Sequence, residues 1–234
     1  MIRIRHSGER GYADFGWLKS RHTFSFGNYH DDSFMGHGPL RVINEDRVEA
    51  GRGFGAHSHR DMEILSWVLE GALQHKDSIG TGAVIKPGEL QRMTAGTGIT
   101  HSEFNHSSEN GVHFLQIWII PAQQGLKPGY EQRDFSAKFD DTLYLVASGD
   151  GRDKSVLVHQ DVDLYVARPA VSANLTHTFA AGRLGWIQVA RGSIELNGQP
   201  LQQGDGAAVD NIEQLKMEAL EDAELLLFDM AATQ

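Results

Sequence analysis

Short runs of apolar residues recur along this chain, and residues that favour turns separate them. Examples are LRVIN from Leu40, VHFLQIWII from Val112 and ELLLFDM from Glu224. The 26 glycines supply the backbone conformations that many tight turns need. Strands of this length and spacing, with little helical periodicity, predict an all-β fold of the sandwich or barrel type. We expect one short helix, near Asn211–Glu218.

A weak internal repeat indicates two related β modules in tandem. One copy begins at Trp67 and the other at Ile187, and each has a Val-x-x-Gly turn, a short strand and a Gly-acidic pair. A length of 234 residues suits two domains of ordinary size. The polar, turn-rich stretch from Pro121 is the best candidate linker. We therefore expect domains at residues 1–130 and 131–234.

Composition excludes several classes of protein. The net charge of −10 disfavours direct binding to nucleic acid phosphates, and no basic run suggests a membrane surface. The chain has no cysteine, which excludes disulfides, thiolate metal sites and cysteine nucleophiles. The N-terminal residues lack the apolar core of a secretory signal, and the stretch LQIWII is too short to span a bilayer. We therefore expect a cytoplasmic protein.

Two pairs of metal-ligand residue types have the same spacing. His57 and His59 lie in GFGAHSHRDMEI, and His101 and Glu103 lie in GTGITHSEFN. Residues i and i+2 of a strand point to the same face, so each pair can present two ligands together. One such pair also occurs by chance on a solvated strand. Two pairs on neighbouring strands predict a single site of three imidazoles and one carboxylate.

The histidines place this site in the first half of the chain. Ten of the 12 histidines lie at or before His113. Neutral imidazoles and a carboxylate suit Fe(II), Mn, Co, Ni, Cu or Zn. Glu63 shares the face of His57 and His59 if the strand continues unbroken, so it is an alternative carboxylate ligand. His75, beside Lys76 and Asp77, is expected to be solvated.

The spacing of these residues resembles the two cupin motifs. Gly51-x5-His57-x-His59-x3-Glu63, followed by Gly71, is similar to the first motif, with one extra residue before Gly71. Gly98-x2-His101-x3-Asn105 is similar to the second. Leu90 and Gly96 stand where a general cupin has Gly and Pro, a departure typical of one branch of these proteins.

That branch is the pirin family. The segments HTFSFGNYHD from His22, LRVINEDRVEAGRGFGAHSHRDMEILSWVLEG from Leu40 and MTAGTGITHSEFN from Met93 resemble pirin. The resemblance is closest to bacterial pirin-like proteins described as quercetin 2,3-dioxygenases. It is dense in the first half and thinner afterwards, where VHQDVDLYVA from Val158 is also similar.

The resemblance implies a bicupin, with two tandem jelly-roll-like β-barrels and a metal only in the first. It implies His57, His59, His101 and Glu103 as ligands, and Fe(II) as the metal, with Zn, Ni, Cu, Mn or Co as alternatives. It also implies a dioxygenase that opens the heterocyclic ring of flavonols such as quercetin and releases carbon monoxide. Glu103 is then the first candidate for the general base, and Glu63 is the second.

Two other functions stay open at this stage. One is a non-enzymatic, metal-containing, redox-responsive regulatory protein that acts through protein partners, as eukaryotic pirin implies. The other is a different cupin reaction, such as another dioxygenase or a sugar-phosphate isomerase. The isomerase is disfavoured because no basic residues cluster near the ligand motifs. Two barrels in one chain are compatible with a monomer.

Overall fold

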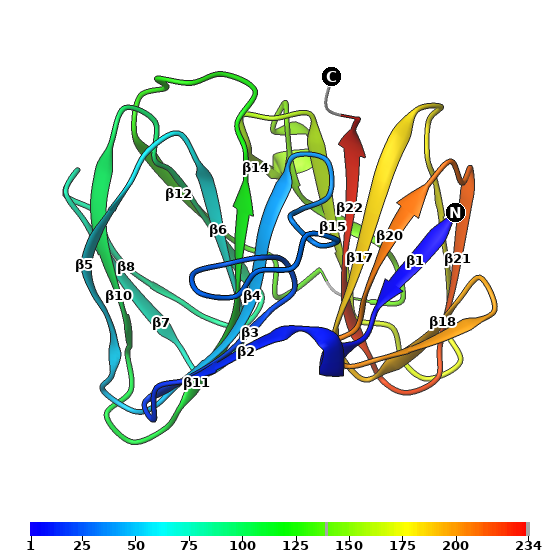
Figure 1. Cartoon of the computed structure of the whole chain (residues 1–234), viewed down its shortest axis with the longest axis horizontal. Helices are drawn as coiled ribbons and strands as arrows, with labels where there is room; N and C mark the ends of the chain where they lie inside the picture. The colour runs from blue at the N-terminus through cyan, green and yellow to red at the C-terminus, as the bar shows by residue number, and fades with distance from the viewer. Residues whose placement is uncertain (139, 233–234) are drawn as a thin grey trace.

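The computed structural model describes residues 1–138 and 140–232 of the chain. Its regular structure consists of strands, apart from two short 3-10 helices, η1 (Ser7–Glu9) and η2 (Arg152–Lys154). Figure 1 shows two β-sandwich halves side by side, the first mostly in blue to green and the second mostly in green to red, with the dark blue N-terminal strand in the second. Within the described residues, no helix is long and apolar enough to cross a membrane.

The first half packs a seven-stranded sheet against a four-stranded sheet. The larger sheet contains, in spatial order, β12 (Gly129–Asp134), β9 (Glu89–Thr94), β6 (Glu63–Glu70), β11 (Val112–Ile119), β4 (Leu40–Val48), β3 (Leu18–His22) and β2 (Gly11–Asp14). The smaller sheet contains β5 (Gly53–His59), β10 (Ile99–Asn105), β7 (Leu73–Asp77) and β8 (Gly82–Ile85).

The second half repeats this architecture. Its larger sheet contains β1 (Ile2–Arg5), β20 (Gly206–Asp210), β17 (Arg183–Arg191), β22 (Glu224–Ala231), β15 (Val162–Ala167), β13 (Tyr144–Ser148) and β14 (Val156–Leu157). The smaller sheet contains β16 (Asn174–Thr178), β21 (Gln214–Ala219), β18 (Ser193–Leu196) and β19 (Gln199–Gln202).

The expected helix near Asn211–Glu218 is wrong, because most of this segment forms strand β21. Along β21 the residues alternate between exposed and buried, with Leu215 and Met217 inside and Lys216 outside. This two-residue period is that of a half-buried strand. Pairing with β16 and β18 on either side satisfies its backbone groups.

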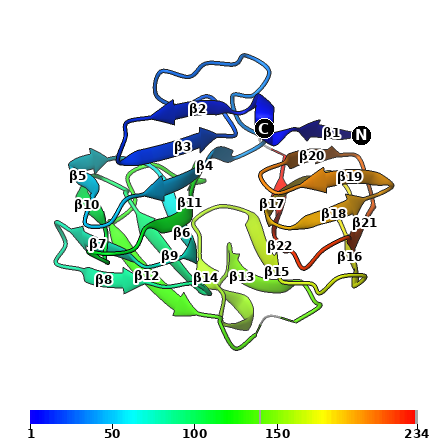
Figure 2. The same ribbon diagram turned by 90° about the horizontal axis from the view of Figure 1, so that it is seen from below.

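Two strand pairings depart from a simple division of the chain at residue 130. Strand β1 pairs with β20, so the N-terminal residues complete the large sheet of the second half (Figure 2). Strand β12 pairs with β9 in the first half and spans the boundary expected near residue 130. That boundary stays a prediction, as do the cytoplasmic location and the monomeric state.

The largest apolar cluster lies where the two seven-stranded sheets face each other. Leu65 and Trp67 of β6 pack there with Val166 of β15 and Phe228 of β22. Burial of this apolar surface is the main force that joins the halves. Because side chains alternate along a strand, the intervening Ser66 points into the first barrel instead.

The interiors of the two barrels differ in chemistry. Aliphatic side chains fill the second barrel, among them Ile187, Leu196 and Leu225. Strands β4, β6 and β11 instead send polar side chains into the first barrel, including Asn44, Ser66 and Gln116. Polar groups in a protein interior need hydrogen-bond partners or a ligand. The first barrel is therefore the one built to hold a ligand.

Candidate metal centre

Strands β5 and β10 are antiparallel neighbours, and their register brings the two predicted pairs of ligand residues together. His57 lies directly opposite His101, and His59 lies opposite Ile99. The register shifts between His101 and Glu103, as at a β-bulge. A bulge re-aims the side chains beside it, and such irregularities are common next to functional sites.

Three imidazoles converge at this point. The ligand nitrogens of His57, His59 and His101 lie within 4.8 Å of one another. The ring centroids of His57 and His101 are 4.5 Å apart, and the Nε2 atoms of these two rings are 3.1 Å apart. Nitrogens bound to one divalent metal at about 2.0–2.1 Å have a separation of this order, roughly 3 Å.

The protonation states also suit a metal. The Nδ1 atom of His57 lies 2.8 Å from the Gly55 carbonyl oxygen and donates to it, which leaves Nε2 with a free lone pair. Burial, together with the charge of His57, lowers the pKa of His59 to about 4. Burial and the neighbouring imidazoles lower the pKa of His101 to about 3. The His59 and His101 rings are thus neutral at pH 7, as metal binding requires.

Glu103 is buried next to this cluster. Its Oε2 accepts a 2.7 Å hydrogen bond from Gln116 Nε2, and its Oε1 accepts a 3.3 Å bond from Ser66. A carboxylate oxygen of Glu103 lies within 4.8 Å of ligand nitrogens of His75 and His101. Burial raises the pKa of Glu103 in spite of these hydrogen bonds. Its carboxylate is therefore a stronger base than an exposed glutamate.

His75 is not solvated as expected but has no exposed surface. Its Nδ1 lies 3.4 Å from His101 Nδ1, and its Nε2 lies 3.0 Å from Asp77 Oδ2. The expectation failed because β7 is an inner strand of the four-stranded sheet and the His75 ring packs inside the barrel against the rings of His101 and Tyr130. His75 and Asp77 form a third i, i+2 pair. This spacing in the sequence could have indicated that His75 lies on the same strand face as Asp77, inside the barrel.

Glu63 does not reach the imidazoles. The strand carrying His57 and His59 ends at His59, and the chain turns at Asp61, where φ is 47°, before β6 begins at Glu63. The two-residue alternation that would have placed Glu63 on the face of His57 and His59 is therefore interrupted. Glu63 instead faces the second half, where its Oε2 accepts hydrogen bonds from the backbone and ring nitrogens of His159, each 3.1 Å long.

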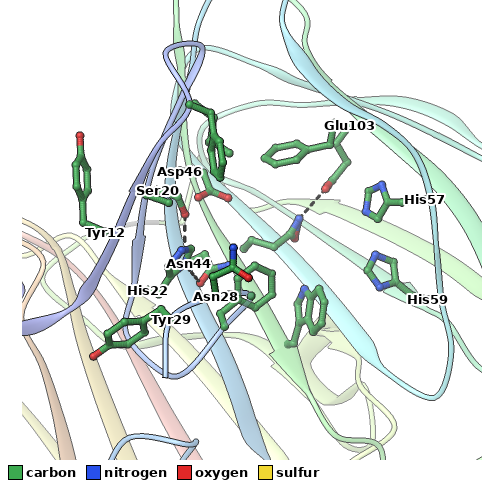
Figure 3. Close-up of a pocket in the computed structure, with 18 residues that line it drawn as sticks. Tyr12, Ser20, His22, Asn28, Tyr29, Asn44, Asp46, His57, His59 and Glu103 are labelled. Atoms are coloured by element: carbon green, nitrogen blue, oxygen red, sulfur yellow. Dashed lines mark hydrogen bonds between the residues drawn. The ribbon is translucent and has the colours of Figure 1, made fainter. Parts of the chain in front are cut away.

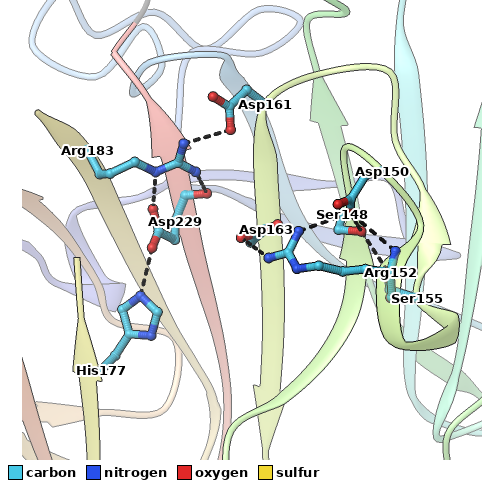
Figure 4. Close-up of polar contacts among 9 residues, drawn as sticks. All are labelled: Ser148, Asp150, Arg152, Ser155, Asp161, Asp163, His177, Arg183 and Asp229. Carbon is cyan, nitrogen blue, oxygen red and sulfur yellow. Dashed lines mark hydrogen bonds and ion pairs between the residues drawn. The ribbon is translucent and has the colours of Figure 1, made fainter. Parts of the chain in front are cut away.

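A cavity of about 490 Å³ lies against this cluster, with His57, His59 and Glu103 on its wall (Figure 3). Its volume is within the usual range for small-molecule sites, about 300–1,000 Å³. Aromatic and apolar side chains form much of the remaining wall, including Leu18, Phe26, Phe54 and Trp118. The ring of Trp118 meets that of His59 edge to face, with centroids 5.0 Å apart. A flat, largely apolar ligand suits this shape and lining.

Comparison with known proteins agrees with this architecture. Residues 3–119 match the pirin family, and residues 145–230 match the quercetinase C-terminal cupin domain. The quercetin 2,3-dioxygenase of Escherichia coli (strain K12) is 49% identical over 230 residues, which cover 98% of this chain and 99% of that protein. A crystal structure of quercetin 2,3-dioxygenase from Acinetobacter baumannii shares the fold, with a TM-score of 0.78 at 18% identity. The superposition covers 98% of this chain and 79% of the Acinetobacter chain.

A crystal structure of bacterial pirin YhhW from Escherichia coli in complex with nickel(II) matches with a TM-score of 0.95 and 48% identity, covering 100% of both chains. Two cupin domains in one chain, with the histidine cluster and its cavity in the first, define a bicupin. The chain belongs to the pirin family. The predicted fold class and the predicted family are therefore confirmed.

Proposed function

We propose that this protein is a metal-dependent dioxygenase that opens the heterocyclic ring of flavonols such as quercetin with release of carbon monoxide. The observation that carries the proposal is a cluster of three imidazoles beside a buried carboxylate, with His57, His59 and Glu103 on the wall of a cavity that is rich in aromatic side chains. The identity of 49% with a quercetin 2,3-dioxygenase over nearly the whole chain supports it. In the reaction both atoms of dioxygen enter the ring-opened product, and one ring carbon leaves as carbon monoxide.

The proposed ligands are His57, His59, His101 and Glu103. When bound, a divalent metal acts as a Lewis acid that lowers the pKa of a substrate hydroxyl and holds the substrate in place. We propose Fe(II) as the native metal, from the family resemblance. A nickel(II) complex is the crystallised form of one relative. Donor sets of this kind accept several first-row metals, so activity with each metal decides which one is preferred.

Glu103 is the proposed general base for the 3-hydroxyl of the flavonol. Its Oε2 is held by the short hydrogen bond from Gln116, whereas its Oε1 has only the longer bond from Ser66. We therefore assign the incoming proton to Oε1. Burial raises the pKa of Glu103, which moves this carboxyl toward the pH at which a general base is most effective.

The apolar side chains of the cavity have two roles in this proposal. Phe26, Phe54 and Trp118 give flat surfaces against which the fused rings of a flavonol can stack. They also exclude water from the reacting atoms, which strengthens the electrostatic effect of Glu103. These side chains select for a planar aromatic substrate, while a metal held by the imidazoles would select for one with adjacent oxygen donors.

The test is carbon monoxide release from quercetin in air. Protein loaded separately with Fe(II) and Ni(II) is compared with metal-free protein and with the His101→Ala variant. We expect carbon monoxide from the loaded wild type alone, and the faster of the two metals identifies the preferred one. Full metal occupancy without carbon monoxide would overturn the proposal and favour the regulatory, partner-binding function instead.

A further inference from the structure

A row of buried polar side chains crosses the inner face of the seven-stranded sheet of the first barrel. It begins beside Glu103 and leads away from the candidate metal centre. The register places Ser66 opposite Gln116, Gln116 opposite Asn44, and Asn44 opposite His22. Gln116 bonds Glu103 at one end, and at the other end His22 Nδ1 lies 2.8 Å from Asn44 Oδ1. The cavity wall therefore has two polar regions, one at Glu103 and the other at Asn44 and His22.

Asp46 is a carboxyl on the cavity wall close to Asn44 and His22. It lies on β4 two residues after Asn44, so both side chains point into the barrel. Only 5% of Asp46 is exposed, and the register of β3 and β4 places Ser20 directly opposite it. Its Oδ1 atom has no hydrogen-bond partner among the described residues. Figure 3 shows Asp46 across the pocket from His57 and His59.

A buried carboxyl oxygen without a partner needs an explanation, because such atoms are rare in folded proteins. Burial, with smaller contributions from Glu103 and Glu45, raises the pKa of Asp46 to about 7. The carboxyl can accept a hydrogen bond in either protonation state. Trp118, on the same wall, also has a ring N–H without a partner in the described part of the chain. Both groups lack a bonding partner that a polar ligand would supply.

We propose that Asp46 accepts a hydrogen bond from a ring hydroxyl of the bound flavonol, at a position remote from the 3-hydroxy-4-keto group. The inference rests on the proposed function and narrows its substrate class to flavonols that are hydroxylated elsewhere on the rings. The aromatic side chains of the cavity hold the ring system, and Asp46 fixes its orientation. An aromatic ligand without such a hydroxyl leaves the carboxyl unpaired and binds more weakly.

The experiment compares two flavonols that share the same chelating group. Quercetin carries additional ring hydroxyls, and 3-hydroxyflavone carries none. Equilibrium binding to Fe(II)-loaded protein is measured by absorbance without oxygen, so that no turnover is needed. The quantity of interest is the ratio of the two dissociation constants. We expect the preference for quercetin to fall about tenfold in Asp46→Leu, which is roughly the value of one hydrogen bond.

Asp46→Asn keeps an acceptor oxygen in nearly the same volume, so we expect it to retain part of the preference. It also serves as the test variant if Asp46→Leu does not fold. Asp32→Asn, which removes an exposed carboxylate whose side chain is 95% accessible, is the matched control and should keep the wild-type ratio. Galangin, which lacks the hydroxyls of the pendant ring, assigns the contact to one ring or the other.

A preference in Asp46→Leu within twofold of the wild type would overturn the inference. The proposed function fails separately, if loaded wild-type protein binds quercetin with the expected preference but releases no carbon monoxide. Release of carbon monoxide with an unchanged preference in Asp46→Leu would instead leave the proposed function standing and remove the role of Asp46. Failure of wild-type protein to bind either flavonol would overturn both.

Discussion

His75 Nδ1 faces His101 Nδ1 at 3.4 Å, while the other nitrogen of His75 lies 3.0 Å from Asp77 Oδ2. This arrangement fixes the tautomer of His101. Asp77 accepts the proton of His75 Nε2, so His75 Nδ1 is an acceptor and His101 Nδ1 carries a proton. The Nε2 lone pair of His101 is then directed at His57 Nε2, 3.1 Å away, where the proposed metal binds. Such outer partners orient metal-binding histidines in many proteins.

Replacing His75 is expected to weaken metal binding without unfolding the protein. His75→Phe keeps an aromatic ring but removes both nitrogens, and Asp77 keeps its hydrogen bonds from the backbone of Ile79 and Thr81. We expect a loss of about 10–100-fold in metal affinity. Competition titration with a chelator measures it. His30→Phe, at an exposed histidine, is the control, and equal affinities in both variants would contradict the role of His75.

The two buried glutamates should respond differently to the same substitution. Glu103→Gln removes the proposed base, and we expect flavonol turnover to fall by about 10²-fold or more. Glu63→Gln should keep metal content and turnover within twofold, because Glu63 faces His159 in the second half. We expect it to lower the free energy of unfolding by about 1–3 kcal/mol, through a weakened buried hydrogen bond. Urea melts and carbon monoxide assays separate the two effects, and lost turnover in Glu63→Gln would restore it as a candidate base.

Glu45 should make stability depend on pH in the acid range. Burial raises the pKa of Glu45, but the hydrogen bond from His113 and the charge of Arg10 outweigh it, and the pKa falls from 4.5 to about 2. The folded protein therefore binds this proton less readily than the unfolded chain. The stabilisation is complete above about pH 4.5 and is lost as the pH falls toward 2.

Urea melts at two pH values check this contribution. Between pH 6 and pH 3.5 we expect the wild type to lose about 1.4 kcal/mol more of its unfolding free energy than Glu45→Gln, which has no carboxyl to titrate. The difference isolates Glu45 because every other group titrates in both proteins. Parallel losses in the two proteins would show that Glu45 has a similar pKa in the folded and unfolded states.

Much of this architecture could be predicted from the sequence, because period-two alternation and glycine-rich turns are local signals. The same is true of the pairs His57, His59 and His101, Glu103, whose spacing alone places each pair on one face of a strand. The i, i+2 rule predicts a shared face only within one continuous strand. The turn at Asp61, with a φ of 47°, ends the strand before Glu63 and sends that side chain to the other half of the molecule.

The rest depends on register between strands that are distant in the sequence. His75 meets His101 only because β7 pairs with β10, and Asp46 joins Ser20 only because β4 pairs with β3. No local pattern determines which strands become neighbours. For the same reason, nothing near Ile2–Arg5 indicated that this first strand would complete the sheet of the second half.

Gly53 and Gly55 provide a matched pair for testing how closely β5 must approach β10. A Cβ atom added at Gly53 would lie 2.3 Å from the Glu103 carbonyl oxygen and 2.5 Å from Phe104 Cα. Both are backbone atoms, so they cannot move without shifting the strand that carries His101 and Glu103. A Cβ atom added at Gly55 meets nothing within 4 Å.

We therefore expect Gly53→Ala to push β5 away from β10 and to separate the two halves of the ligand set, with a loss in metal affinity of at least about tenfold. Its unfolding free energy should fall by about 1–3 kcal/mol, as for other overpacked sites. Gly55→Ala should keep the wild-type affinity, since neither glycine has a positive φ that would strain an alanine. Chelator competition and urea melts on both variants measure these effects. If Gly53→Ala bound metal as tightly as Gly55→Ala, the close contact between the strands would not be what positions the imidazoles.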